Sequence, residues 1–162
     1  MAIDDDRLGR LPETLRPGVS RWFERLEEMH GRQSLGADVE EPLSRVIAVS
    51  EFAGKVLLTD WEYWRGRLQQ LSSPADLQEL QAFADDPGLV AAGIDDVKSR
   101  LRRFRHRFLL GVLWREVAGA ATLAETLCAL SALADQMLAV AGRYAERQLE
   151  ERFGRFRDSD GT

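Results

Sequence analysis

Apolar residues recur at helical spacing in two long stretches of the second half of the chain. In the first stretch the intervals of three and four place them on one face of a helix over about residues 94–117. They are Ile94, Val97, Leu101, Phe104, Phe108 and Val112. From Phe108 to Trp114 the sequence is apolar on nearly every side, so the second half of this helix should be the deeper one.

The second stretch, over about residues 122–153, begins with a capping box. The hydroxyl of Thr122 can accept a hydrogen bond from the backbone N–H of Glu125, whose carboxylate can accept from the N–H of Thr122. The apolar positions that follow alternate steps of four and three, the spacing of a seam between antiparallel helices. They are Leu123, Leu127, Leu130, Ala134, Met137, Ala141 and Tyr144. We therefore expect a long antiparallel pair over 94–117 and 122–153.

Shorter stretches with helical spacing precede this pair. They cover approximately residues 17–29, 43–58, 61–71 and 73–84. The first begins either near Pro17 or after a separate turn over residues 11–16, because a proline inside a helix removes a backbone hydrogen bond. Residues 30–41 indicate a loop, and no stretch alternates with the period of a strand. The expected fold is all-α, with about six helices and no sheet.

The length of 162 residues favours a single domain with its own core. We expect a flexible acidic start over residues 1–9, one helical domain over 10–154 and a polar linker over 155–162. No apolar run approaches the roughly 20 residues of a membrane span, and the acidic start is unlike a signal peptide. These features predict a cytoplasmic protein without a membrane partner.

Several segments resemble the N-terminal helical region of glutamine synthetase adenylyltransferase. The long pair carries Leu101-Arg102-Arg103-Phe104-Arg105-His106-Arg107, Trp114-Arg115-Glu116 and Leu130-Ser131-Ala132-Leu133-Ala134-Asp135. Upstream, Ser50-Glu51-Phe52-Ala53 and Trp61-Glu62-Tyr63-Trp64 are similar to the family's "Ser-Asp-Phe … Pro-Glu-Trp-Leu" segment. The chain departs from the family at Trp61, where a proline is usual, and the match is weak before about Val46. Phe153-Gly154-Arg155 resembles the last helical turn before the family's first catalytic domain.

The resemblance implies an enzyme that transfers AMP from ATP to a tyrosine of glutamine synthetase and removes it by phosphorolysis. Its partners would be glutamine synthetase and the PII regulatory protein, in the control of nitrogen assimilation. The family's chemistry lies in two nucleotidyltransferase domains, which use magnesium and carry a Gly-Lys-Leu-Gly-Gly loop and a Ser-Asp-x-Asp pair. Neither motif occurs in this chain. The resemblance therefore implies a non-catalytic segment, inactive alone, that serves as scaffold and docks on the rest of the enzyme.

One group of residues is a candidate docking surface: Arg100, Arg103 and Arg107, at i, i+3 and i+7 opposite the Leu101–Phe108 face. This cationic stripe could be a solvated face paired with acids of the N-terminal half. It could instead dock on another domain of the parent enzyme, or bind nucleic acid. Residues 1–96 hold 10 basic and 19 acidic side chains, whereas residues 97–162 hold 12 and 8, which favours pairing within the chain over nucleic acid.

No catalytic, cofactor-binding or metal-binding residue is predicted. Asp158-Ser159-Asp160 lies in a polar tail without the strand and loop that phosphoryl transfer requires. The aromatic residues Trp61, Tyr63 and Trp64 are expected in the core, His106 on the surface, and Cys128, the single cysteine, in a buried structural position. Two hypotheses compete with the enzyme segment: a free-standing helical adaptor for a protein partner and, more distantly, a small RNA-binding protein.

Overall fold

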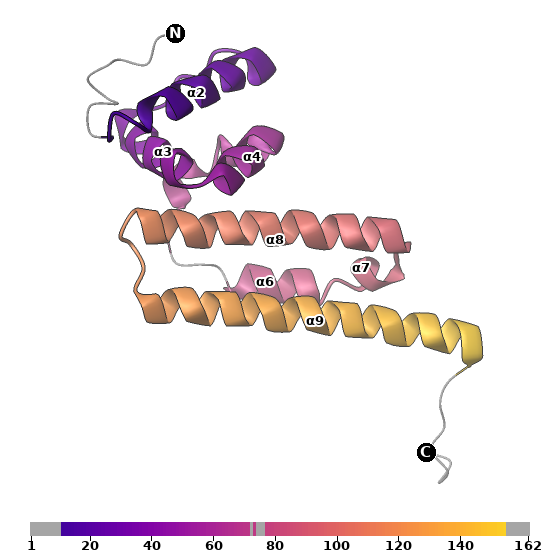
Figure 1. Ribbon diagram of the computed structural model, residues 1–162. Helices are drawn as coiled ribbons and strands as arrows, with labels where there is room; N and C mark the ends of the chain where they lie inside the picture. The colour runs from indigo at the N-terminus through magenta and orange to yellow at the C-terminus, as the bar shows by residue number, and fades with distance from the viewer. Residues whose placement is uncertain (1–10, 72, 74–76, 155–162) are drawn as a thin grey trace. The chain divides into compact units, whose positions relative to one another are not determined.

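Every regular element among the described residues is a helix (Figure 1). The computed structural model describes residues 11–71, 73 and 77–154. In chain order the elements are α2 (Arg16–His30), α3 (Ala37–Val49), α4 (Glu51–Thr59), α5 (Trp61–Trp64), the 3-10 helix η1 (Leu68–Gln70), α6 (Leu77–Ala84), α7 (Pro87–Ala91), α8 (Ile94–Val117) and α9 (Leu123–Phe153). The all-α class is confirmed. The expected flexible start and the expected linker at 155–162 lie outside the described residues.

The chain divides into two compact units, which are described separately. The first comprises Met1–Ala75 and His106–Thr126, and the second comprises Asp76–Arg105 and Leu127–Thr162. Helix α8 therefore contributes its first half to the second unit and its second half to the first. One helical domain over residues 10–154 stays a prediction.

Tryptophans from three helices form the centre of the first unit's core. Trp22 of α2 and Trp61 of α5 pack edge to face, with ring centroids 6.4 Å apart, and Trp114 of α8 is buried in the same cluster. The other buried members are Leu26, Val39, Leu43, Val46, Ala53, Val56, Leu57, Trp64, Leu68 and Leu110. Fully burying one large aliphatic side chain contributes about 1.5–3 kcal/mol, so this cluster is sufficient to hold the short helices against α8.

The first helix starts near Pro17, and a separate turn precedes it, so both features that the prolines suggested are present. Residues 13–15 form a turn, in which the N–H of Leu15 donates to the carbonyl of Pro12 at 2.9 Å, and α2 then begins at Arg16 with Pro17 in its first turn. A proline is tolerated there because the N–H groups of the first turn have no partner within the helix.

Two expectations for the next segment are wrong. The helix expected over 43–58 is broken at Ser50, whose extended backbone ends α3 and whose hydroxyl accepts from the N–H of Ala53 at 3.2 Å to cap α4. The loop expected over 30–41 is also too long, because α3 already begins at Ala37 and includes Pro42. Burial of Val39 on the first turn of α3 offsets the hydrogen bond that the proline removes.

The first of the two stretches that follow is shorter than expected. The stretch at 61–71 forms only α5 and η1. The helix expected over 73–84 ends at Ala84 as α6, while its expected start includes residues 74–76, which lie outside the described part. After α6, the carboxylate of Asp86 accepts from the N–H of Gly88 at 2.9 Å and caps the short helix α7.

In the second unit, α6 and α7 pack beside α9 and the first half of α8 (Figure 1). Ala84, Leu89 and Val140 form a buried cluster, against which Phe83 and Leu101 pack. Phe83 of α6 stacks on Phe104 of α8, with ring centroids 3.9 Å apart and planes 9° from parallel. Polar contacts reinforce this packing. The guanidinium of Arg143 donates to the backbone carbonyl of Ala84, and the side-chain amide of Gln136 donates to Oε1 of Gln81 at 2.9 Å.

The boundaries expected for the long pair are confirmed, and its connection is tightly fixed. The N–H of Ala120 donates to the carbonyl of Arg115 at 2.8 Å, and Gly119 adopts a positive φ of 68° to make this turn. The capping box forms as predicted: the N–H of Glu125 donates to the Thr122 hydroxyl at 3.2 Å, and the N–H of Thr122 donates to the Glu125 carboxylate at 2.8 Å. After this connection the chain continues as α9.

Helix α8 buries one side in its first half and more than one side in its second half. Val97 is buried in the first half, while Leu110 and Trp114 are buried in the second. Val97 and Leu110 are separated by about 220° around a helix of 3.6 residues per turn. Of the single face predicted from the spacing, Val97 and Val112 are buried, Leu101, Phe104 and Phe108 are half-buried, and Ile94 is exposed. The face is thus partly present, and the predicted deeper second half is confirmed.

The seam predicted on α9 is wrong. Its buried residues are Ala129, Leu133 and Val140, while Leu123, Leu127 and Leu130 of the predicted seam are exposed. The reason is that α9 is apolar on more than one side, so the spacing alone does not select the face that contacts α6 and α8. Within the described residues, α9 is the one helix that is long and apolar enough to cross a membrane, by length and composition only.

Candidate functional site

The three arginines of the predicted docking surface have different surroundings. Arg100 forms an ion pair with Asp86, which precedes α7. The Nε of Arg107 lies 2.5 Å from Oδ2 of Asp60, and its guanidinium carbon lies 3.5 Å from the centre of the Tyr63 ring. Arg100 and Arg107 thus each pair with an acid of the N-terminal half and are only partly exposed.

The third arginine of the stripe remains available. Arg103 is exposed, and the described part of the chain gives it no hydrogen bond or ion pair. Lys98, Arg102 and Arg105 on the same helix are likewise exposed. The cationic surface that α8 presents therefore consists of these four side chains, and Arg103 is the only member that belongs to the predicted stripe.

The Arg100 pair shapes the electrostatics of the α7 cap. The hydrogen bond from Arg100 is the largest cause that lowers the pKa of the Asp86 carboxyl, followed by the bond from the N–H of Gly88. A carboxylate held ionised in this way is a poor general base at neutral pH, because a general base needs a pKa near the working pH. The pair is therefore suited to fixing α7 on α8 rather than to proton transfer.

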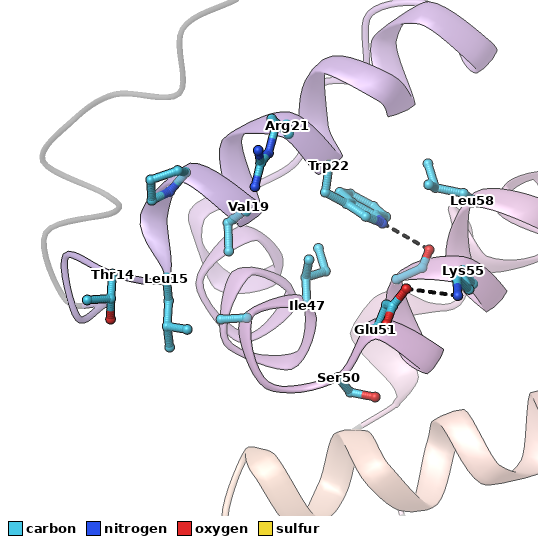
Figure 2. A pocket seen from close by; sticks show the side chains of 14 residues that line it. Thr14, Leu15, Val19, Arg21, Trp22, Ile47, Ser50, Glu51, Lys55 and Leu58 are labelled. Carbon is cyan, nitrogen blue, oxygen red and sulfur yellow. Dashed lines mark hydrogen bonds and ion pairs between the residues drawn. The ribbon is translucent and has the colours of Figure 1, made fainter.

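A cavity of about 370 Å³ opens between α2, α3 and α4 in the first unit. Figure 2 shows Val19, Trp22, Ile47 and Leu58 as its apolar lining. At the rim, Nζ of Lys55 lies 2.8 Å from the Glu51 carboxylate, and this ion pair is largely exposed. The volume of the cavity is at the lower end of the range for ligand pockets, roughly 300–1,000 Å³.

One glycine determines the shape of this cavity. The indole N–H of Trp22 donates to the carbonyl of Gly54 at 2.9 Å, as Figure 2 shows. A Cβ on Gly54 would lie 3.1 Å from two atoms of the Trp22 indole. The glycine thus allows α2 and α4 to approach until the indole forms part of the wall. The cavity is able to hold an apolar side chain, and it arises from packing that no local sequence motif indicates.

The remaining candidate residues from the sequence are aromatic side chains, one histidine and possible metal ligands. Trp61 and Trp64 are buried in the core, while Tyr63 is half-buried beneath Arg107. His106 is half-buried, with its ring 5.4 Å from that of Phe52, so it is less exposed than expected. Over the described ranges, no three His, Cys, Asp or Glu side chains are grouped closely enough to hold a metal ion.

The expectation for the single cysteine is wrong. Cys128 is exposed, because it lies on a side of α9 that α6 and α8 do not cover. Its apolar sequence neighbours suggested burial, but Leu127 and Leu130 are exposed as well.

Comparison with known proteins connects these observations to one family. The family model described as glutamate-ammonia ligase adenylyltransferase matches residues 40–162. The relative from Pseudomonas aeruginosa, a bifunctional glutamine synthetase adenylyltransferase/adenylyl-removing enzyme, is 35% identical over 162 residues, covering 91% of this chain and 16% of its own length. Relatives of the same name from Thioalkalivibrio sulfidiphilus and Shewanella loihica are 31% and 27% identical, covering 93% and 94% of this chain.

These matches extend further toward the N-terminus than the resemblance in the sequence did, since they include most of the first 45 residues. The chain spans about one sixth of the length of the relatives it matches. No solved structure gives a significant match. With the family model covering most of its residues, the chain belongs to the glutamate-ammonia ligase adenylyltransferase family.

Proposed function

We propose that this chain is a non-catalytic helical segment of an enzyme that adenylylates and deadenylylates glutamine synthetase, and that it acts as a scaffold that docks on the rest of that enzyme. One observation carries the proposal: the match covers more than nine tenths of this chain but only 16% of the relatives. The activity named for the relatives therefore belongs to polypeptides about six times longer.

The chemistry of AMP transfer supports a non-catalytic role. Such a reaction requires carboxylates that hold magnesium and a loop that binds the phosphates of ATP. The sequence contains neither a Gly-Lys-Leu-Gly-Gly loop nor a Ser-Asp-x-Asp pair. The described residues contain no cluster suited to a metal ion. In this proposal, ATP and magnesium bind elsewhere in the enzyme, and glutamine synthetase and the PII protein are partners of the whole enzyme.

The proposed docking includes the arginine surface of α8. Arg103 is the member of the Arg100, Arg103 and Arg107 stripe that an acidic partner could reach without breaking an existing pair. An exposed ion pair contributes about 0–1 kcal/mol, so Arg103→Gln should weaken docking only slightly. This surface would orient the segment rather than provide most of the binding free energy.

The test uses the Pseudomonas aeruginosa relative from which the matched segment has been deleted. Isothermal titration of this truncated enzyme with the 162-residue chain should give a saturable heat, and the mixture should transfer AMP to glutamine synthetase faster than the truncated enzyme alone. The chain by itself should transfer no AMP and bind magnesium-ATP with a Kd no lower than about 100 μM. Absence of binding to the truncated enzyme would refute the docking role and favour the free-standing adaptor.

A further inference from the structure

Three leucines of α9 in the second unit lie on one exposed side of the helix. They are Leu127, Leu130 and Leu138, with 54%, 36% and 71% of their surface exposed. Their spacings of three and eight keep them within about 80° of one another around a helix. We call these three residues the outer leucine face. The buried residues Ala129, Leu133 and Val140 lie on a different side, where α9 contacts the rest of its unit.

The outer leucine face has the properties of a helix-packing surface. Small exposed residues flank it, among them Ser131, Ala134 and Ala141, so the backbone of another helix can approach closely. Between Leu123 and Gly142 the only charged residues are Glu125 and Asp135. Large contiguous apolar surfaces on soluble proteins usually mark interaction sites, because exposing each leucine forgoes the free energy of burying it.

We propose that the outer leucine face docks on an apolar helical surface in the part of the family's longer polypeptide that lies outside the matched segment. This inference rests on the proposed function and names the surface that provides most of the binding free energy. The matched relatives devote about five sixths of their length to that other part. In the relatives, that other part and the segment similar to this chain, which includes α9, belong to one polypeptide.

Tethering selects this occupant over a second copy of the chain. Two parts of one polypeptide that can reach each other meet at an effective concentration that generally exceeds the concentration of a second molecule in solution. The other side of α9 argues against a membrane span, because Gln136 and Arg143 make polar contacts with α6 there. A spanning helix would have to place these polar groups in lipid, which is costly.

The experiment compares three forms of the 162-residue chain in binding to the truncated Pseudomonas aeruginosa enzyme. The test variant is Leu127→Gln/Leu138→Gln. The control variant is Met29→Gln/Val49→Gln, which changes two apolar residues of similar exposure on α2 and α3. All four side chains are exposed, so both variants should keep the wild-type urea midpoint within error. We expect the test variant to raise Kd at least thirtyfold and the control to change it less than about threefold.

Each other outcome has a defined meaning. If wild type binds and the test variant binds equally well, docking stands and the outer leucine face is not its surface. If wild type does not bind, the proposed function fails together with this inference. Sedimentation that shows a wild-type dimer, lost in the test variant, would assign the face to a second copy and overturn the proposal. Co-sedimentation of wild type, but not the test variant, with phosphatidylcholine vesicles would overturn it in favour of a lipid surface.

Discussion

Two leucines of α9 provide a direct test of which side of this helix is buried. Leu133 is 4% exposed, whereas Leu127, which the sequence pattern places in the seam, is 54% exposed. Replacing a buried leucine by alanine costs about 2–5 kcal/mol, which combines the lost transfer free energy with the cavity left behind. Leu133→Ala should therefore lower the free energy of unfolding by about 3 kcal/mol. Leu127→Ala should change it by less than about 0.5 kcal/mol, the usual range for a surface substitution.

The measurement is urea unfolding followed by far-ultraviolet circular dichroism. With an m value of about 2 kcal/mol/M, a loss of about 3 kcal/mol moves the midpoint down by about 1.5 M. Leu133→Met serves as the control, because it keeps most of the volume and should cost less than about 1.5 kcal/mol. A midpoint for Leu127→Ala as low as that for Leu133→Ala would refute the observed face and restore the seam predicted from the sequence.

Three further outcomes are expected. Phe104→Ala should cost about 2 kcal/mol in urea unfolding, less than the roughly 3–5 kcal/mol for a fully buried aromatic, because Phe104 is half-buried beside Phe83. The folded-state pKa of Asp86 lies below its ordinary value of 3.8 because Arg100 donates to it, so its stabilising effect is present above that pH and lost as pH falls through the folded pKa. Asp86→Asn, which keeps a capping oxygen, should thus lose less stability than wild type in thermal unfolding as the pH is lowered below about 4. Cys128 should react with a thiol reagent in the native protein within about threefold of its rate in denaturant, since it is exposed.

The sequence was most informative where several signals agreed. The bounds of α8 and α9 could be predicted because long apolar periodicity coincided with the capping box of Thr122 and Glu125. The buried side of α9 could not be predicted, since leucine and alanine occur on nearly every side and spacing alone does not show that Leu133 is buried while Leu130 is exposed. In the first half of the chain, one serine at position 50 both ends α3 and caps α4, a role that apolar spacing does not reveal.

The candidate sites show the same limit. Arg100 and Arg107 each pair with an acid of the N-terminal half, and such acids are among the partners that the sequence suggests. Their identity as Asp86 and Asp60 depends on how the short helices pack, which the sequence alone did not determine. The cavity beside Trp22 likewise results from the approach of α2 and α4 at Gly54.

The surfaces of α8 and α9 together predict how docking should respond to salt. Arg100 and Arg107 already have acidic partners within the chain, so new ion pairs would arise chiefly from Arg103 and its exposed neighbours, at about 0–1 kcal/mol each. The outer leucine face offers more, because burying an exposed leucine contributes about 1.5–3 kcal/mol and involves no charge. Raising sodium chloride from about 50 mM to about 500 mM shortens the screening length severalfold and weakens exposed ion pairs, but it does not weaken apolar contacts. The Kd for the truncated enzyme, measured by titration at both salt concentrations, should therefore change less than about threefold. A more than tenfold rise in Kd at high salt would mean that the arginines of α8, rather than the leucines of α9, provide most of the binding free energy.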